Sequence, residues 1–536
     1  MSSGNFDAVI IGGGHNGLVC AAYLAKAGLS VKVLEKRSVV GGAAVTEEFS
    51  PGFRNSTCSY TVGLLSPLVV ADLGLFENGL KLVPRPMSNF LPTENGGCLR
   101  AYADHQRFSN EIGIQCPGDS NALKGYHLAL EGVSKVIREQ LYNTPPNLRG
   151  GLWELWKGWK ASKQFLSLDA EVQNNLLEIF TVSASKFLSR WFEGESIKAL
   201  LAFDGIVGHF ASPHHPGTAY VLLHHCLGEI MPHGSWGHAI GGMGAISDAI
   251  ARSARKAGVL IETMSPVTRL LINDKKRTIG VEVEGGKAIY GRVIVSNINP
   301  KLLFNTLVEP SYVPLDFLNR ISRYECVSGS FRMNVALGEL PDFLCLPGKN
   351  MADHHGAGIV LAPTLDYQHQ AFEDAKKLGW SKRPIVEIVI PSTLDSSLAP
   401  EGKHVASLFC QHFSPKLPNA RNWDMCRELA ADSVINLITE FAPNFRSSII
   451  AQQILSPLDL EREFSLLGGD IFHGSLTLNQ IWSSRPLLGH SDYRMPLHGL
   501  YLCGAGAHPG GGVTGIPGRN AAKEILKDFS WWSKKK

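Results

Sequence analysis

Three glycines near the start of the sequence have the spacing of a phosphate-binding turn. Gly12, Gly14 and Gly17 follow a short apolar run and precede small residues that favour a helix. In that setting the first glycine permits a tight turn, the second lets the backbone approach a pyrophosphate, and the third lets helix and strand pack closely. The unpaired amides at the start of the helix then face the anionic phosphates. The spacing predicts dinucleotide binding, and a turn without a ligand is the alternative.

A carboxylate follows where a bound ribose needs one. Glu35 ends the next apolar run, about 20 residues on, at a position where a carboxylate accepts hydrogen bonds from ribose hydroxyls. Arg37 and the pair Gly41-Gly42 come next, an extension that is typical of FAD-binding amine oxidases and phytoene desaturases and that NAD dehydrogenases do not need. We therefore predict FAD as the cofactor. Arg37 is expected to reach the phosphates, with a plain surface charge as the alternative.

A second glycine-rich segment lies near the C-terminus, from Gly504 to Gly515. A helix that begins near Thr514 would direct its positive end at the pyrimidine edge of a flavin and stabilise negative charge there. A glycine-rich turn without a ligand is again the alternative. We expect this segment to fold back onto the N-terminal glycines.

Five longer stretches can be compared with a known family. They are DAVIIGGGHNGLVCAAYLAKAGLSVKVLEKRSVVGGAAVTEEFSPGF, SPHHPGTAYVLLHH, GGMGAISDAIA, GGDIFHG and GLYLCGAGAHPGGGVTGIPGRNAA. Together they resemble the phytoene-desaturase-like branch of FAD oxidoreductases, the carotenoid and retinoid oxidoreductase type, over nearly the whole chain. The resemblance implies an FAD-dependent enzyme that dehydrogenates, saturates or isomerises an apolar, isoprenoid- or lipid-like substrate by hydride transfer at flavin N5, with oxygen or a quinone as electron acceptor.

The resemblance also implies a set of cofactor contacts. The backbone near Val267 is expected beside the adenine, and Ser296 and Asn297 are expected to close the second cofactor-binding strand. The full predicted FAD set is Gly12, Gly14, His15, Asn16, Gly17, Glu35, Lys36, Arg37, Gly41, Gly42, Ala43, Ala44, Val267, Ser296, Gly504, Gly506, Gly511, Gly512 and Val513.

Catalytic side chains are harder to choose, because flavin N5 accepts hydride directly and no protein base is obligatory. His508 adjoins the C-terminal glycines as a candidate proton donor or ring contact. His473, Tyr60 and Phe53 are candidates for the wall of the substrate cavity. For each histidine a hydrogen-bonded structural role is the alternative. A further histidine group lacks carboxylates or cysteines at ligand spacing, so no metal is expected there; it comprises His209, His214, His215, His224 and His225.

The elements that must position these residues follow from the apolar pattern. Strands are expected over 7–11, 31–34, 259–262, 267–272, 280–284, 289–296 and 499–503, with helices ending near 27 and spanning 245–256. These predict an α/β fold with a discontinuous Rossmann-like FAD-binding domain (1–80, 235–300 and 490–530) interleaved with an α+β substrate domain (81–234 and 301–489). Trp153, Trp156 and Trp159 have helical spacing and are expected to pack in a core. Gly241 to Gly244 follow no clean strand and are not expected to bind a second nucleotide.

Composition excludes several other classes of function. A net charge of +3 over 536 residues gives no reason to expect nucleic acid as a partner. The ten cysteines are scattered singly, so thiol exchange through a cysteine pair is not expected. No apolar run reaches the roughly 18 residues of a spanning helix. Trp531, Trp532 and the final lysines suit either a peripheral membrane contact or a solvated tail.

Location and catalysis each keep an alternative. The resemblance implies the mitochondrial matrix, whereas Met1 to Asp7 lack the basic and apolar parts of a targeting segment, which makes the cytoplasm the alternative. The second hypothesis for function is a flavin-bound regulator of mitochondrial function that acts through protein partners with little or no catalysis.

Overall fold

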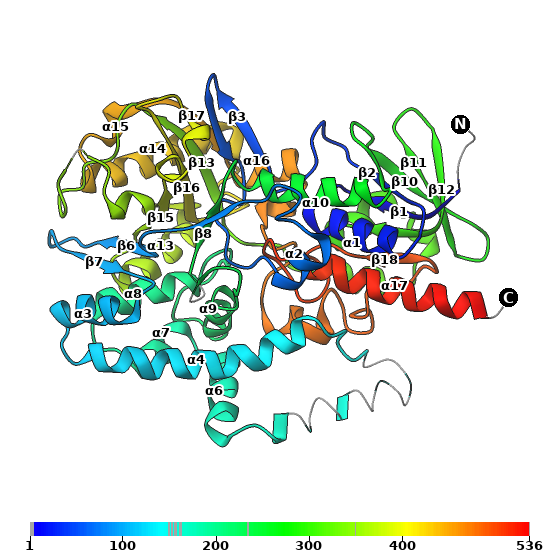
Figure 1. Ribbon diagram of the computed structural model, residues 1–536, viewed down its shortest axis with the longest axis horizontal. Coiled ribbons are helices and arrows are strands. Elements are labelled where there is room, and N and C mark those ends of the chain that lie inside the picture. The colour runs from blue at the N-terminus through cyan, green and yellow to red at the C-terminus, as the bar shows by residue number, and fades with distance from the viewer. Residues whose placement is uncertain are drawn as a thin grey trace.

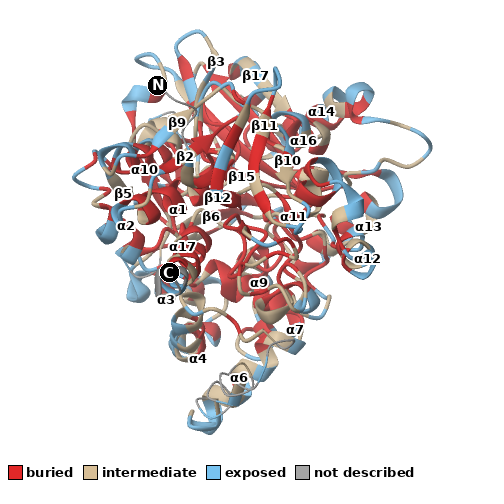
Figure 2. Ribbon diagram, turned by 90° about the vertical axis from the view of Figure 1, so that its right-hand side faces the viewer, coloured by how far each residue is buried: buried red, intermediate tan, exposed pale blue. Residues whose placement is uncertain are grey.

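The structure is a computed structural model that describes residues 5–147, 165–232, 235–348 and 350–534, together with residues 151, 154, 158, 159 and 163. Two seven-stranded sheets lie side by side, each covered by helices (Figure 1). Buried residues are concentrated in the two sheets and the helices against them, whereas α6 (Ala170–Thr181) lies at one end with much of its surface exposed (Figure 2).

The first sheet has the strand order β10-β11-β12-β1-β2-β9, and β18 also pairs with β12. The strands are β1 (Phe6–Ile11), β2 (Val31–Leu34), β9 (Leu260–Glu262), β10 (Val267–Ile272), β11 (Thr278–Val283), β12 (Ala288–Ser296) and β18 (Leu500–Leu502). β1 is apolar throughout its centre because parallel neighbours flank it on both sides and helices cover both faces. All seven expected strands are therefore confirmed, with bounds that differ by about two residues at most.

Three helices position the glycine-rich segments on this sheet. They are α1 (His15–Lys26), α10 (Gly244–Lys256) and α17 (Ile516–Lys534). α1 packs between α10 and α17 (Figure 1). Its apolar residues are small, which allows close approach: Ala21 and Ala22 have no exposed surface. Chain segments from both ends of the sequence thus share one core with the first sheet.

The second sheet has the order β17-β13-β16-β15-β14-β6-β7. Its strands are β6 (Asn89–Pro92), β7 (Cys98–Ala101), β13 (Phe331–Leu337), β14 (Gly358–Leu361), β15 (Trp380–Val389), β16 (His404–Phe413) and β17 (Ile449–Leu455). One face packs on α14 (Trp423–Phe441). The other face packs in a hydrophobic core that also contains residues of α8 (Glu195–Asp204), α9 (Thr218–His225) and α13 (Leu365–Leu378).

The remaining helices cover the outside of these layers. They are α2 (Pro67–Leu73), α3 (His105–Gln115), α4 (Asp119–Leu141), α7 (Ala184–Ser189), α11 (Pro300–Leu302), α12 (Leu315–Ser322), α15 (Phe445–Ser448) and α16 (Pro457–Phe464). The core-packing prediction is wrong for Trp159, whose surface is 60% exposed. Trp153 and Trp156 lie outside the described residues. Over the described ranges, no helix combines the length and apolar character needed to cross a bilayer.

Some segments cross the domain boundaries expected from the sequence. The hairpin of β3 (Thr46–Ser50) and β4 (Phe53–Ser56) packs on the second sheet, where Asn55 Nδ2 donates to Asn334 Oδ1 at 3.1 Å. Residues 303–326 instead contribute to the core of the first sheet. A second small sheet pairs β5 (Leu82–Pro84) with β8 (Gly237–Ala239) in antiparallel fashion. Through these contacts the segments around the first sheet are connected to those around the second.

Candidate functional site

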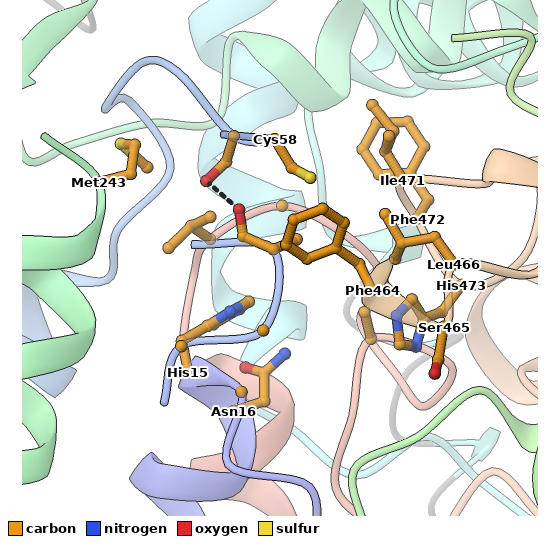
Figure 3. A pocket seen from close by; sticks show the side chains of 18 of the residues that line it. His15, Asn16, Cys58, Met243, Phe464, Ser465, Leu466, Ile471, Phe472 and His473 are labelled. Carbon is orange, nitrogen blue, oxygen red and sulfur yellow. Dashed lines mark hydrogen bonds between the residues drawn. The ribbon is translucent and has the colours of Figure 1, made fainter. Parts of the chain in front are cut away.

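A cavity of about 350 Å³ lies between the two sheets. Its wall is built from segments that are far apart in the sequence, including the turn before α1, the end of β2, the start of β10 and the C-terminal glycines. Figure 3 shows His15 and Asn16, at the start of α1, on one side of it and Phe472 and His473 on another. The cavity therefore sits at the carboxyl ends of the parallel strands, where open α/β sheets bind their ligands.

The glycine turn has the geometry that its spacing predicts. Gly12 has φ of +94°, a left-handed conformation that other residues rarely adopt. A Cβ on Gly17 would lie 2.3 Å from the carbonyl oxygen of Gly12, so only glycine permits this approach of α1 to the turn. The first turn of α1 consequently presents its backbone amides to the cavity.

Glu35 links the end of β2 to this turn. Its Oε2 accepts a hydrogen bond from the Gly13 N–H at 2.7 Å, and its Oε1 accepts one from the Arg37 N–H at 2.9 Å. Only 5% of its surface is exposed. These bonds fix the carboxylate at the cavity wall, where it can still accept hydrogen bonds from a ribose.

The paired glycines after Arg37 run beside the first turn. The Gly41 N–H donates to the Gly13 carbonyl at 2.8 Å. A Cβ on Gly42 would lie 3.2 Å from the Cα of Gly14. The two backbone segments thus form one wall with no side chains between them, which leaves a narrow strip open to an extended cofactor.

The C-terminal segment closes the site from the other side. The His15 ring hydrogen-bonds to the backbone of Gly512, and burial lowers the pKa of His15 to about 4, so that the ring is neutral. Gly512 and Val513 line the cavity just before α17 begins at Ile516. The positive end of α17 therefore lies next to the start of α1, as the sequence led us to expect.

Arg485 holds the C-terminal segment in place. This residue is fully buried, and its guanidinium group donates to the carbonyl oxygens of Ala505 at 2.7 Å, Phe472 at 2.7 Å and Gln480 at 3.0 Å. These acceptors belong to both loops that border the cavity. One side chain thus fixes the position of His473 relative to the C-terminal glycines.

Buried polar atoms without partners indicate that the site is shaped for a polar ligand. Asn16 Oδ1, His15 Nε2, Arg37 Nη1 and His473 Nδ1 have no hydrogen-bond partner among the described residues. All four residues line the cavity. Because buried polar groups are rarely left unpaired in folded proteins, a ligand with several acceptors and donors fits this wall, and the phosphates and ring edges of FAD provide them.

The structure divides the predicted FAD residues into two groups. The first lines the cavity and consists of Gly12, Gly14, His15, Asn16, Glu35, Lys36, Arg37, Gly41, Gly42, Ala43, Val267, Gly512 and Val513, together with Asn297. The second lies behind this wall and consists of Gly17, Ala44, Ser296, Gly504, Gly506 and Gly511. Members of the second group permit close packing: a Cβ on Gly511 would lie 2.2 Å from the ring of Phe472.

The two candidate catalytic histidines occupy different positions. His473 lines the cavity, and burial next to Arg485 lowers its pKa to about 4. His508 is absent from the described cavity wall; its Nε2 lies 3.2 Å from the Gln140 carbonyl oxygen, and Tyr493 Oη donates to the His508 carbonyl at 3.0 Å. The contacts of His508 are those of a residue that joins α4 to the C-terminal segment.

Tyr60 lines the cavity, as expected, but Phe53 does not. Phe53 packs instead with Ala336, Leu398 and Val405, because β4 turns toward the second sheet. The five histidines of the 209–225 region form no metal-binding group: in the described ranges, no three histidine, cysteine or acidic side chains converge to hold a metal ion.

Beyond the glycine turn the cavity continues into a mainly apolar chamber. Its wall includes Phe203, Val207, Trp236, Phe409 and Phe472. Three charged residues, which the sequence interpretation missed, also belong to this region: Asp204, Glu387 and Arg85, the last lying 3.7 Å from Glu387. Asp204 directly follows the apolar run Ala199–Phe203, and Glu387 interrupts the apolar run Ile385–Ile390. A charged residue in such a place was the available hint.

Comparison with known proteins agrees with this arrangement. Residues 10–67 match the family model of the NAD(P)-binding Rossmann-like domain. The structure of wild-type putrescine oxidase bound to putrescine has the same fold, with a TM-score of 0.60 and 15% identity over 98% of this chain and 99% of that one. The fold is therefore of the amine-oxidase and phytoene-desaturase type, an α/β fold with a Rossmann-like FAD-binding domain.

Two relatives extend over almost the whole chain. Pyridine nucleotide-disulfide oxidoreductase domain-containing protein 2 of Rattus norvegicus is 41% identical, over 98% of this chain and 94% of its own length. Prolycopene isomerase 2 of an Oncidium hybrid cultivar, a chloroplastic protein, is 23% identical, over 99% of this chain and 85% of its own length. The chain belongs to the family of pyridine nucleotide-disulfide oxidoreductase domain-containing protein 2. The predicted resemblance is confirmed.

The family name refers to disulfide chemistry. All ten cysteines are free thiols, but the structure brings together two pairs that are far apart in the sequence. Cys98 hydrogen-bonds to Cys345, which lowers the pKa of Cys98 to about 7, and Cys20 hydrogen-bonds to Cys503. These four residues are not part of the cavity wall, whereas Cys58 lines it and burial raises the pKa of its thiol. Gly241 and Gly242 follow β8, which pairs antiparallel with β5 and lies outside the first sheet. They thus lack the parallel strand that a second nucleotide turn requires.

Proposed function

We propose that the protein oxidises an apolar, isoprenoid- or lipid-like substrate by hydride transfer to FAD, with oxygen or a quinone as the electron acceptor. The observation that carries this proposal is that the chamber wall of Phe203, Val207 and Phe409 and the glycine turn at Gly12 line one continuous cavity. A substrate in the chamber would therefore reach the flavin end of a cofactor held at the turn. The mainly apolar wall favours a substrate of the same character.

The residues at the turn would hold the cofactor by complementary charge. The first amides of α1 would bind the pyrophosphate, Glu35 the ribose and the start of α17 the pyrimidine edge of the flavin. Bound FAD supplies a hydride acceptor at N5 of its ring. The chain itself then has to position the substrate and exclude water, which the buried aromatic wall does.

His473 is the side chain that we assign to the flavin side of the chamber. Its backbone has φ of +56°, a conformation that costs energy for a residue other than glycine and that clusters at functional sites. Because its pKa is about 4, the ring stays neutral near pH 7. We therefore assign it a hydrogen-bonding role toward cofactor or substrate, in place of a role as proton carrier, and assign His508 a structural role.

The test is anaerobic reduction of the bound flavin. Isoprenoid and lipid-like compounds are added to the purified protein, and loss of the flavin absorbance is followed. We expect bleaching by a subset of these compounds. Val207→Trp, which fills the chamber away from the glycine turn, should retain FAD and lose the bleaching. Bound FAD that none of these compounds reduces would contradict the proposal.

A further inference from the structure

One carboxyl group in the chamber has no structural role. Asp204 is the last residue of α8 and lines the cavity. No hydrogen bond or ion pair joins its carboxyl group to another side chain in the described part of the chain. Leaving such a group unpaired in an apolar wall reduces stability. A carboxyl group kept there despite this cost is a candidate for contact with a ligand.

The neighbouring charges are already paired. The Tyr60 hydroxyl donates to Glu387 Oε2, and Arg85 lies 3.7 Å from Glu387 Oε1. Arg85 also donates to Thr61 Oγ1 at 2.8 Å. The two carboxyl groups therefore differ. Glu387 has Tyr60 and Arg85 as side-chain partners, whereas the carboxyl group of Asp204 faces the chamber without a side-chain partner.

The surrounding charges favour the protonated form of Asp204. Burial and the negative charge of Glu387 raise the pKa of Asp204 to about 7, against the opposing effect of Arg85. Cys226 and Tyr126 also interact with Asp204, but burial raises the pKa of both, so they are neutral. His225, on the adjoining helix, is neutral as well because burial lowers its pKa to about 4. At and below neutral pH the Asp204 carboxyl can donate a hydrogen bond.

The cations in this cluster decide which ligand chemistry fits. Arg332 is fully buried, lies 4.5 Å from the centre of the Tyr60 ring, and has two guanidinium nitrogens without hydrogen-bond partners among the described residues. Arg332 and Arg85 lie behind the cavity wall, and Glu387 at the wall is already paired with Arg85 and Tyr60. An ammonium or carboxylate group brought to this end of the mainly apolar chamber would therefore lose its hydration without gaining an unpaired counter-ion at the wall. A neutral oxygen costs less to bury.

We infer that Asp204 donates a hydrogen bond to an uncharged oxygen of the substrate, a hydroxyl or a carbonyl, so that the substrate is an oxygenated isoprenoid or lipid and not a plain hydrocarbon. This inference rests on the proposed function, because it places the apolar body of the same substrate in the chamber. Tyr60 and Glu387 act as positioning residues, since they fix the polar end of the wall next to Asp204.

The experiment compares C10 probes that differ at one end. Dissociation constants of the aldehyde geranial, whose oxygen can only accept a hydrogen bond, of geranylamine and of the hydrocarbon myrcene are measured from the flavin absorbance of the holoprotein under anaerobic conditions, at pH values on either side of about 7. We expect geranial to bind about tenfold more tightly than myrcene at the lower pH. That preference should disappear at the higher pH, where Asp204 is ionised.

Two matched variants separate a hydrogen bond from a structural effect. Asp204→Asn keeps a donor, so it should retain the preference for geranial and lose its pH dependence. Asp204→Leu should bind geranial and myrcene equally. FAD content and melting temperature of both variants are measured alongside, to show that the site is intact.

Each possible result either supports or overturns the inference about Asp204. Equal binding of geranial and myrcene by the unchanged protein at both pH values would overturn it, while bleaching of the flavin by either compound would leave the proposed function standing. If geranylamine bound more tightly than geranial at the higher pH, the ligand group at Asp204 would be an amine, and the inference would be overturned as well. If no probe binds, the inference and the proposed substrate class fail together, whereas the FAD spectrum is unaffected.

Discussion

Gly518 faces the carbonyl oxygen of Asn16 so closely that a Cβ on the glycine would lie 2.1 Å from that oxygen. This contact is where α17 crosses the first turn of α1. It brings the C-terminal glycine segment against the N-terminal one, although the two are separated by almost the whole chain. The site for the cofactor therefore depends on the packing of these two helices.

Replacing Gly518 should disturb the site directly. Gly518→Ala places a methyl group against backbone, which cannot move as a flexible side chain can, and should reduce the free energy of unfolding by about 1–3 kcal/mol. We expect weaker retention of FAD, measured as flavin released during gel filtration. Gly118→Ala is the control, because a Cβ at Gly118 would meet nothing within 4 Å. Equal FAD retention by both variants would contradict this account of the helix crossing.

Removing the Arg485 side chain should destabilise both loops at once. Arg485→Met leaves the carbonyls of Ala505, Phe472 and Gln480 without their donor, and each buried unpaired acceptor costs about 1–3 kcal/mol. Arg485→Lys should retain only part of the stability that the arginine provides, because the lysine ammonium lacks the planar fork of the guanidinium group. Chemical denaturation of the holoprotein measures the loss. Arg462→Met, at an exposed ion pair with Asp424, should change stability far less, because solvent screens such a pair.

Substitutions of His473 and His508 should have different effects, the first on flavin reduction and the second on stability. His473→Leu should slow reduction of the flavin by substrate by about tenfold or more, whereas His473→Gln, which keeps hydrogen-bonding groups, should slow it less. His508→Leu should lower the melting temperature, because it breaks the contact with Gln140, and should leave the reduction rate of the folded protein nearly unchanged. If His508→Leu slowed flavin reduction and His473→Leu lowered only the melting temperature, the catalytic candidate would be His508 instead.

Asp204 should make stability depend on pH in a defined direction. Its pKa rises from 3.8 to about 7 on folding, so the folded state binds the proton more tightly. The resulting stability is present below the unfolded pKa and is lost as the pH rises through about 7. Asp204→Asn should therefore be more stable than the unchanged protein at about pH 8, by on the order of 2 kcal/mol, and the difference should shrink at about pH 4.

Urea denaturation of the two proteins at both pH values measures this difference. Asp248→Asn, at an exposed position on α10, provides the matched control and should show no such pH-dependent gain. Parallel stability curves for the Asp204 variant and the unchanged protein would mean that the carboxyl is not held in a desolvating environment.

The part of the site that could be predicted from the sequence is the part with local patterns. The β1–α1–β2 unit follows from an apolar strand buried on both faces and a glycine turn before a helix, so Gly12, Gly14 and Glu35 were found correctly at the cavity wall. The strands that pair around it were recognisable for the same reason. Their order in the sheet depends on pairing between distant segments, which no local pattern encodes.

The polar end of the chamber could not be predicted in this way. Asp204 and Glu387 come from the end of α8 and from the last part of β15, and only the packing of both domains brings them next to Tyr60, the one member of this group that the sequence suggested. The position of His508 was misleading for a related reason. It adjoins the flavin segment in sequence, but its ring is directed at Gln140, on a helix whose place is set by the substrate half of the protein.

The most direct test of the account is the absorption spectrum of the purified protein, followed by extraction and identification of the cofactor, for the unchanged chain and for Glu35→Ala. We predict a flavin spectrum with about one FAD per chain for the unchanged protein. The variant should lose most of its FAD, because the ribose loses its carboxylate and Gly13 loses its acceptor. A colourless protein that takes up no added FAD would contradict the central claim.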